Sequence, residues 1–251
     1  MRQPIKLLPL LGPILVLGLW WAVTAFRIVI PELLPPLGKT SQRFIELFAS
    51  GVIFPHLWAT LYRTLIGLGA ACLLGVPIGL VLGRYTRIYQ AFGIVIDFFR
   101  SLPGTALFPL FLLLFGIGDG SKIALAFFIS FWVILLNSAY GVLHGSKTRT
   151  KVAKSLGATN WQIFTGVTCM EALPQIFVGL RTAISLSLIM VVVSEMFIGS
   201  DMGLGQKVYD SYLTYEAVSL YAWLLIIGLL GFALNRLFLL LERHTLHWVG
   251  K

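Results

Sequence analysis

Charged residues are scarce in this sequence. Asp, Glu, Lys and Arg make up 12% of the 251 residues, whereas hydrophobic residues make up 58%. An ordinary soluble domain has about 25% charged residues, because its surface is solvated. The shortage of charge therefore argues against a soluble globular domain and favours a chain that lies in a membrane.

The few charges leave uncharged or nearly uncharged runs that are about as long as a bilayer is thick. About 20 apolar residues in a helix cross the hydrocarbon core of roughly 30 Å. Lipid offers the backbone no hydrogen-bond partners, so the crossing segments are expected to be helices. The sequence thus predicts an all-α integral membrane protein with a single membrane domain over residues 1–251. Its six predicted spans cover about residues 7–26, 64–83, 98–118, 123–143, 175–199 and 217–241.

Cysteine is nearly absent as well. Cys72 falls within a span and Cys169 near an inner helix end, so a disulfide between them is not expected. His244 and His247 have a spacing that could hold a metal, but they lie in a basic tail and are interpreted as solvated side chains. The spans contain no paired histidines, cysteine cluster or nucleophile with a nearby base. The sequence therefore predicts no metal site and no catalytic activity.

Basic residues gather on one side of the predicted bundle. The short outer connections sum to zero or a negative charge, while the inner segments are basic, which is the positive-inside pattern. The net charge of +9 therefore reports membrane topology rather than nucleic-acid binding. Both termini of this multi-pass protein are predicted to lie in the cytosol. The inner basic residues are Arg2, Lys6, Arg84, Arg87, Lys147, Arg149, Lys151, Lys154, Arg243 and Lys251.

Two local patterns each leave two interpretations open. Residues 41–50, SQRFIELFAS, alternate apolar and polar positions in a way typical of an amphipathic helix, either in the membrane interface or packed on the bundle. In the second span, Ala71, Gly75, Gly79 and Gly83 recur every four positions and line one helix face. Such a face lets another helix approach closely, either within the chain or in a second copy.

The connection over residues 144–174 is longer than a turn between two helices requires. Residues 150–156 are compatible with a helix, and Gly157 follows where a helix commonly ends in a left-handed residue. Thr159 and Gln162 form a capping-box pattern that begins a second helix. The sequence therefore predicts two short helices bent at Gly157, with apolar surface that needs a partner.

The segment KVAKSLGATNWQIFTGVTCMEALPQI resembles the EAA loop of binding-protein-dependent ABC importer permeases. The segments TLYRTLIGLGAACLLGVPIGLVLGRY, FFRSLPGTALFPLFLLLFGIGDGSK, GLRTAISLSLIMVVVSEMFIGS and the GLG at residues 203–205 are similar to segments of the same family. The resemblance covers about residues 55–245 and is closest to the nitrate, sulfonate, taurine and bicarbonate branch. It implies a permease whose loop between the fourth and fifth spans couples to a cytosolic ATPase.

The resemblance also implies which loop residues contact the ATPase. Lys151, Val152 and Ala153 stand where the family usually has Glu-Ala-Ala, and Met170 replaces a usual proline. The remaining residues implied in ATPase coupling are Leu156, Gly157 and Ala158 in the bend, with Thr159, Trp161 and Phe164 in the second helix.

The resemblance implies several partners and no cofactor bound by this chain. The sequence contains no G-x-x-x-x-G-K-[ST] motif, so ATP and Mg²⁺ are expected on the partner ATPase. The other expected partners are a second permease chain, identical or similar, and an external substrate-binding protein or lipoprotein. Membrane lipid surrounds the chain, and no nucleic acid is expected.

Charges inside spans are costly and usually face a protein interior or a water-filled path. Arg181 and Glu195 share one face of the fifth span but lie too far apart to pair, and Asp97 and Arg100 are one turn apart. Arg181, Glu195 and Arg100 are therefore candidate residues of a substrate path. An arginine there would favour an anion, in agreement with the small anionic solutes of the resembled branch.

Two other classes of protein fit parts of the sequence. An ion-coupled secondary transporter would need intramembrane carboxylates, for which Asp97 and Glu195 are the candidates. A membrane enzyme or anchor subunit would need catalytic residues that the spans do not offer. The sequence favours the importer permease over both.

Overall fold

A computed structural model describes residues 8–248, and within this range the chain is entirely helical, without strands. The helices are α1 (Leu8–Ala25), α2 (Leu37–Ala49), α3 (Ile53–Arg84), α4 (Thr86–Ser101), α5 (Phe108–Phe115), α6 (Asp119–Leu143), α7 (Lys147–Ser155), α8 (Asn160–Ile163), α9 (Cys169–Ile198), α10 (Leu204–Leu213) and α11 (Ala217–Thr245), with a 3-10 turn at Gly104–Leu107 and a π turn at Phe164–Thr168.

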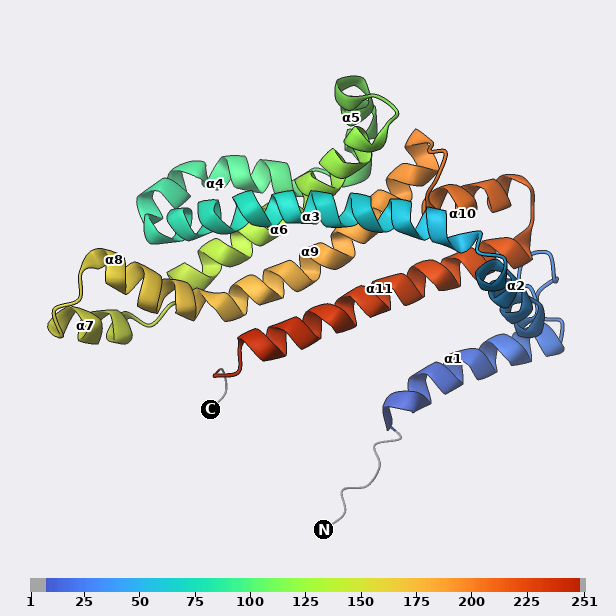
Figure 1. Ribbon diagram of the computed structural model, residues 1–251, viewed down its shortest axis with the longest axis horizontal. Coiled ribbons are helices and arrows are strands. Elements are labelled where there is room, and N and C mark those ends of the chain that lie inside the picture. The colour runs from blue at the N-terminus through green and yellow to red at the C-terminus, as the bar shows by residue number, and fades with distance from the viewer. Residues whose placement is uncertain (1–7, 249–251) are drawn as a thin grey trace, which may run out of the picture.

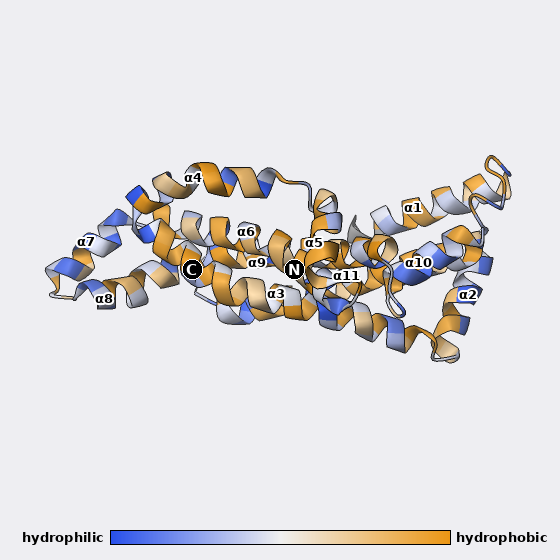
Figure 2. Ribbon diagram, turned by 90° about the horizontal axis from the view of Figure 1, so that it is seen from above, coloured by the Kyte–Doolittle hydropathy of each residue, from blue (hydrophilic) through white to orange (hydrophobic). Residues whose placement is uncertain are grey.

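The long helices α3, α6 and α9 lie side by side in the middle of the molecule (Figure 1). Helices α7 and α8 lie at one end of the bundle, and α2 and α10 lie at the other. Figure 2 shows hydrophobic residues along the long helices and hydrophilic residues concentrated on α7, α2 and α10. The long axis of the bundle therefore has polar ends and an apolar middle, as a membrane-crossing bundle requires.

The number of spans is only partly established. Four helices of the described chain are long and apolar enough to cross a membrane, namely α3, α6, α9 with its preceding turns, and α11. The bent pair α4 and α5 would add a fifth, and Leu11–Ala25 forms a shorter apolar helix. The predicted count of six, with cytosolic termini, remains a prediction.

The predicted continuous span over residues 98–118 is broken in the structure. Helix α4 ends at Ser101, and the following helical segment, from Gly104 to Phe115, is turned by 87°. Pro103 causes the break, because a proline lacks an N–H and disfavours helical geometry in the residue before it. Leu102 accordingly has an extended backbone, with φ −71° and ψ 125°. Hydropathy alone did not reveal this bend.

Helix α3 begins at Ile53, well before the predicted span start at residue 64. The prediction began after Arg63 because charged residues usually end a span. In the structure Arg63 is buried inside the bundle, with 5% of its surface exposed, and the helix continues through it. The buried arginine thus marks a polar cluster rather than a helix end.

Helix α2 packs on the bundle. Leu47 joins a buried cluster with Ile53, Leu204 and Trp223, and Phe44 packs against the same cluster. The opposite side of α2 remains exposed. Of the two interpretations of residues 41–50, the structure thus favours packing on the bundle.

The glycine stripe of α3 forms the contact with α6. A Cβ atom placed on Gly83 would lie 2.6 Å from the carbonyl oxygen of Ala139, and one on Gly75 would lie 3.1 Å from Cγ2 of Ile134. Glycine is needed at such positions because any side chain would push the two helices apart. The stripe therefore serves packing within the chain.

We predict that Gly79→Val destabilises the protein, since a Cβ at this position would lie 2.6 Å from Cβ of Ser138 on α6. The expected loss is about 1–3 kcal/mol of unfolding free energy, the usual cost of overpacking. Thermal unfolding in detergent measures it. Gly69→Ala on the same helix is the matched control, because a Cβ there meets nothing within 4 Å. Equal stability of the two variants would contradict the packing role.

Candidate functional site

The connection over residues 144–174, the predicted inner loop, contains the two short helices that the sequence predicted. After α7 the chain turns at Gly157, which has φ +83°, a left-handed value that favours glycine. The Ala158 N–H donates to the Ala153 carbonyl (3.1 Å), and the Gly157 N–H donates to the Lys154 carbonyl (3.1 Å). These two bonds form a Schellman motif, which fixes the direction of the chain as it leaves α7.

The predicted capping box at Thr159 is present at the start of α8. The Thr159 hydroxyl accepts from the Gln162 N–H (3.3 Å), and the Gln162 side-chain oxygen accepts from the Thr159 N–H (2.8 Å). The loop geometry therefore rests on local hydrogen bonds. It does not depend on a partner to set the bend.

The second short helix continues through a π turn into the long helix α9. A helical segment runs from Asn160 to Ile198 over 39 residues, with the π turn at Phe164–Thr168 near its inner end. Pro174 lies inside this segment, within α9. The non-helical part of the predicted 144–174 connection is therefore shorter than the sequence indicated.

Large apolar side chains are exposed at the tip of the loop. Leu156 is 82% exposed, Trp161 is 72% exposed and Val152 is 53% exposed. Lys151, Gly157 and Thr159 are exposed as well, while Ala153 and Ala158 are half-buried. A cluster of exposed apolar side chains beside polar ones is typical of a docking surface.

Phe164 has a different environment from Trp161. Its ring lies under the guanidinium of Arg84, whose central carbon is 4.9 Å from the ring centroid. Arg84 is the last residue of α3, so this cation–π contact ties the loop to that helix. Phe164 is therefore an anchor of the loop as much as a candidate contact with a partner.

A second anchor ties α7 to the start of α9. Glu171, which is partly buried, accepts a hydrogen bond from the Ser146 N–H (2.7 Å) and forms an ion pair with Arg149. A pocket of about 700 Å³ lies between the two helices, and its lining includes Met170, Leu156 and Trp248. The loop thus contacts both α3 and α9. A displacement of its tip would therefore be transmitted to these long helices.

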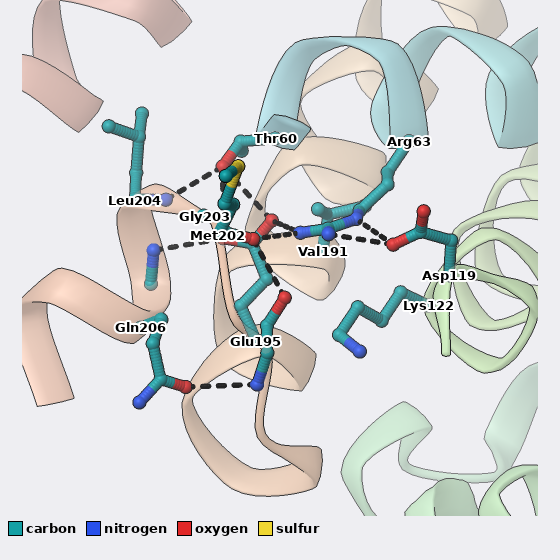
Figure 3. Close-up of polar contacts among 12 residues, drawn as sticks. Thr60, Arg63, Asp119, Lys122, Val191, Glu195, Met202, Gly203, Leu204 and Gln206 are labelled. Carbon is teal, nitrogen blue, oxygen red and sulfur yellow. Dashed lines mark hydrogen bonds and ion pairs between the residues drawn. The ribbon is translucent and has the colours of Figure 1, made fainter. Parts of the chain in front are cut away.

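A charge cluster is buried at the opposite end of the bundle (Figure 3). Glu195 on α9 is fully buried, and its carboxylate accepts from the Arg63 Nη1 (2.6 Å), the Thr60 hydroxyl (2.9 Å) and the Gly205 N–H (2.9 Å). These donors come from α3 and α10. The carboxylate therefore joins three helices.

Arg63 binds further partners in the same cluster. Its Nε and Nη2 each lie 2.7 Å from Oδ1 of Asp119 at the start of α6, and its Nη1 donates to the Met202 carbonyl (2.7 Å). Lys122, with 1% of its surface exposed, donates to the carbonyls of Ile117 (2.8 Å) and Gly118 (3.1 Å). The positive charges are thus compensated by nearby acceptors.

Glycines 203 and 205 allow the start of α10 to approach Glu195. A Cβ on Gly203 would lie 2.5 Å from Oε2 of Glu195, and one on Gly205 would lie 3.0 Å from its Cβ. The Leu204 N–H donates to the Thr60 hydroxyl (2.9 Å). A carboxylate beside a helix N-terminus is favourable, because the unpaired N–H groups carry partial positive charge.

The structure separates the three candidate path residues. Glu195 lies in the buried cluster, whereas Arg181 is exposed on α9 and donates from Nε to the side-chain oxygen of Asn235 on α11 (3.2 Å). Arg100 is exposed near the end of α4 and pairs with Asp97 (2.9 Å). The sequence did not predict that Arg63 and Thr60 belong to a polar cluster with Glu195. The one feature that could have indicated it is that these two polar residues lie one helical turn apart just before the predicted second span.

No group of three or more His, Cys, Asp or Glu side chains that could hold a metal occurs in residues 8–248. Within that range the polar clusters are built from ion pairs and backbone contacts instead. The prediction that the chain itself binds no metal remains a prediction.

Comparison with known proteins gives a consistent set of similarities. The family model described as "Binding-protein-dependent transport system inner membrane component" matches residues 75–247. The taurine transport system permease protein TauC of Escherichia coli K12 is 29% identical over 242 residues, covering 94% of this chain and 87% of TauC. The nitrate import permease protein NrtB of Synechocystis is 28% identical over 187 residues, covering 74% of this chain and 68% of NrtB.

A solved structure has a similar fold. A chain of the MetNI methionine ABC transporter, in an inward-facing conformation, aligns with a TM-score of 0.67 and 21% identity. The alignment covers 75% of this chain and 94% of that chain. At this identity the likeness shows a shared fold and nothing further about function.

We predict that Glu195→Gln lowers the unfolding free energy by about 3 kcal/mol, the lower end of the range for removing one partner of a buried ion pair. The lower end applies because Asp119 still holds Arg63. Thermal unfolding in detergent measures the loss. Asp97→Asn serves as the control, since the side chains of Asp97 and Arg100 are 68% and 56% exposed and such pairs contribute less than about 1 kcal/mol. A Glu195→Gln protein as stable as the control would show that the cluster does not hold the helices together.

Proposed function

Since this chain belongs to the family of binding-protein-dependent transport system inner membrane components, we propose that it forms the solute path of an ATP-driven ABC importer and is driven by a separate ATPase subunit. The chain itself carries out no chemistry in this proposal. It crosses the bacterial cytoplasmic membrane several times, with the α7–α8 end in the cytosol.

The exposed tip of the inner loop is the observation that carries the proposal. Leu156 and Trp161 present apolar surface on a helix pair whose bend is fixed internally by Gly157 and the Thr159 cap. Because the tip of this loop is already folded, it loses little conformational entropy when it binds. Such a tip suits a cleft on a rigid partner. The anchors to α3 and α9 then pass the partner's movement to the bundle.

The ATPase and the solute-delivering protein are separate chains in this proposal. The sequence has no phosphate-binding motif of the G-x-x-x-x-G-K-[ST] type, so ATP and Mg²⁺ belong to the partner. The family description supports an external binding protein that delivers the solute. A second permease chain, identical or similar, completes the path.

The relatives support a small oxyanion as solute. TauC is named for taurine and NrtB for nitrate, and both molecules carry negatively charged oxygens on a small polar group. Arg181 offers a guanidinium that suits such oxygens. We therefore propose nitrate, bicarbonate or a short sulfonate as the class of solute.

We predict ATP-driven uptake by this chain reconstituted with its copurifying proteins. Vesicles are loaded with ATP or left empty, and uptake of labelled taurine, nitrate and bicarbonate is measured. At least one of these anions should accumulate in the vesicles that contain ATP, where the ATP can reach the ATPase subunits. None should accumulate in the vesicles without ATP. Uptake that persists without ATP and follows a proton gradient would instead indicate an ion-coupled secondary transporter.

We predict that Trp161→Ala weakens binding of the ATPase subunit by about 30-fold or more, as expected when a buried aromatic anchor worth about 2 kcal/mol is removed. Binding is measured by titrating the purified ATPase subunit against the permease in nanodiscs. Trp21→Ala is the control, because Trp21 is also well exposed, at 62%, but lies on α1. Unchanged binding in the Trp161 variant would contradict the docking role.

A further inference from the structure

Helix α9 has three polar residues among the exposed positions in its middle. Val178, Arg181, Thr182, Ser185 and Ile189 are exposed, and their spacing of three to four residues places them in one stripe along the helix. The three consecutive members Arg181, Thr182 and Ser185 are hydrophilic. The central part of this stripe is therefore unlike a surface that faces lipid.

Helices α3 and α11 expose mainly apolar residues at comparable positions. On α3 the exposed large residues between positions 65 and 81 are Leu65, Ile66, Leu73, Leu74, Ile78 and Val81. On α11 the exposed large apolar residues are Leu224, Leu229, Phe232, Leu237 and Leu240, and the exposed Arg236 among them lies over the ring of Phe232. These surfaces suit lipid, so the polar stripe of α9 is a local departure from the general pattern.

The stripe lies at the depth of the hydrocarbon core. Ser185 is within two residues, and Arg181 within six, of the middle of the predicted span 175–199, which at 1.5 Å per residue is about 3 Å and about 9 Å. Both distances are less than half of a core of roughly 30 Å. A charged side chain at this depth is costly in lipid and is normally found facing a bundle interior or water.

Arg181 is held in place but keeps most of its donors free. Its Nε donates to the side-chain oxygen of Asn235 (3.2 Å), and its two terminal nitrogens form no hydrogen bond or ion pair within residues 8–248. The hydroxyl of Ser185, one turn further along the stripe, likewise has no hydrogen-bond partner in that range. Asn235 therefore orients a guanidinium whose two terminal nitrogens can donate hydrogen bonds to two oxygens of one anion.

We infer that Arg181, Thr182 and Ser185 of α9, with Asn235 of α11 positioning the arginine, line a water-filled path through which a small oxyanion passes. This inference rests on the proposed import function and names the residues that meet the solute. Glu195 is outside this path, because its carboxylate is enclosed by Arg63, Thr60 and Gly205.

The test uses thiol labelling of the complete complex in proteoliposomes. Cys72 and Cys169 are replaced by alanine, and Thr182→Cys, Ser185→Cys or Leu73→Cys is introduced one at a time. Leu73 is the matched control, because it is 74% exposed but lies on the apolar surface of α3. The probes are 2-sulfonatoethyl methanethiosulfonate, an anion, and 2-(trimethylammonium)ethyl methanethiosulfonate, a cation.

The path predicts that Ser185→Cys and Thr182→Cys react with the anionic probe at least about tenfold faster than Leu73→Cys, because the reactive thiolate forms in water and not in lipid. Adding Arg181→Gln should lower the ratio of anionic to cationic labelling at residue 185 on the order of tenfold, since one charge lies a helical turn away. Arg181→Lys should largely keep the ratio, and the remote Arg87→Gln should leave it unchanged.

Three results would overturn the inference. Labelling at residues 182 and 185 as slow as at residue 73 would place the stripe in lipid. If the thiol introduced at residue 185 reacts with neither probe but forms a disulfide with the same position of a second copy, the stripe is a packed interface between copies. An unchanged probe ratio after Arg181→Gln would remove the role of the arginine. Labelling requires neither ATP nor solute, so its failure is distinguishable from a failure of ATP-driven uptake.

Discussion

Lipid supplies no hydrogen-bond partners to a polypeptide backbone, so a segment that crosses a membrane forms its hydrogen bonds within itself, as a helix. The helical segment from Asn160 to Ile198 is the longest such segment of the described residues. One end of this segment carries the exposed Trp161, its middle carries the polar stripe with Arg181, and its other end carries the buried Glu195. One helix therefore connects the proposed motor contact, the proposed solute path and the buried charge cluster. A displacement applied at the tip has a direct mechanical route to the other two.

The contacts that hold this part of the bundle together differ in extent from one neighbouring helix to the next. The small residues of α3 let α6 pack closely. The Arg63–Glu195 pair and the Gly205 N–H connect α3, α9 and α10 at the end of the bundle beside α10. Helix α11 is much less enclosed and meets α9 at a few places, including the Phe177–Phe238 ring contact, with centroids 5.5 Å apart. We therefore propose that α9 can move relative to α11 while remaining fixed to α3 at the end beside α10.

The sequence predicted features that depend on neighbours along the chain. The Gly157 bend, the Thr159 cap and the apolar spans follow from local spacing, and the structure confirms the bend and the cap. The features it missed depend on partners far away in the chain, such as Arg63 and Glu195, which are 132 residues apart. The sequence does not show whether a charged residue in a span is paired or free. The Arg63–Glu195 cluster and the start of α3 at Ile53 could therefore be identified only from the structure. The break at Pro103 could have been found from the proline.

We propose that the segment from Asn160 to Ile198 moves as one unit when the partner ATPase binds ATP. Electron–electron distance measurement between spin labels at Asn160 and Phe197 tests it, over a helical separation of about 55 Å. If the segment moves as one unit, this distance is the same with and without ATP, while the distance from residue 160 to His244 near the end of α11 changes. A change between residues 160 and 197 of more than about 5 Å, one helical turn, would show that the π turn absorbs the movement and that the segment is not a single moving unit.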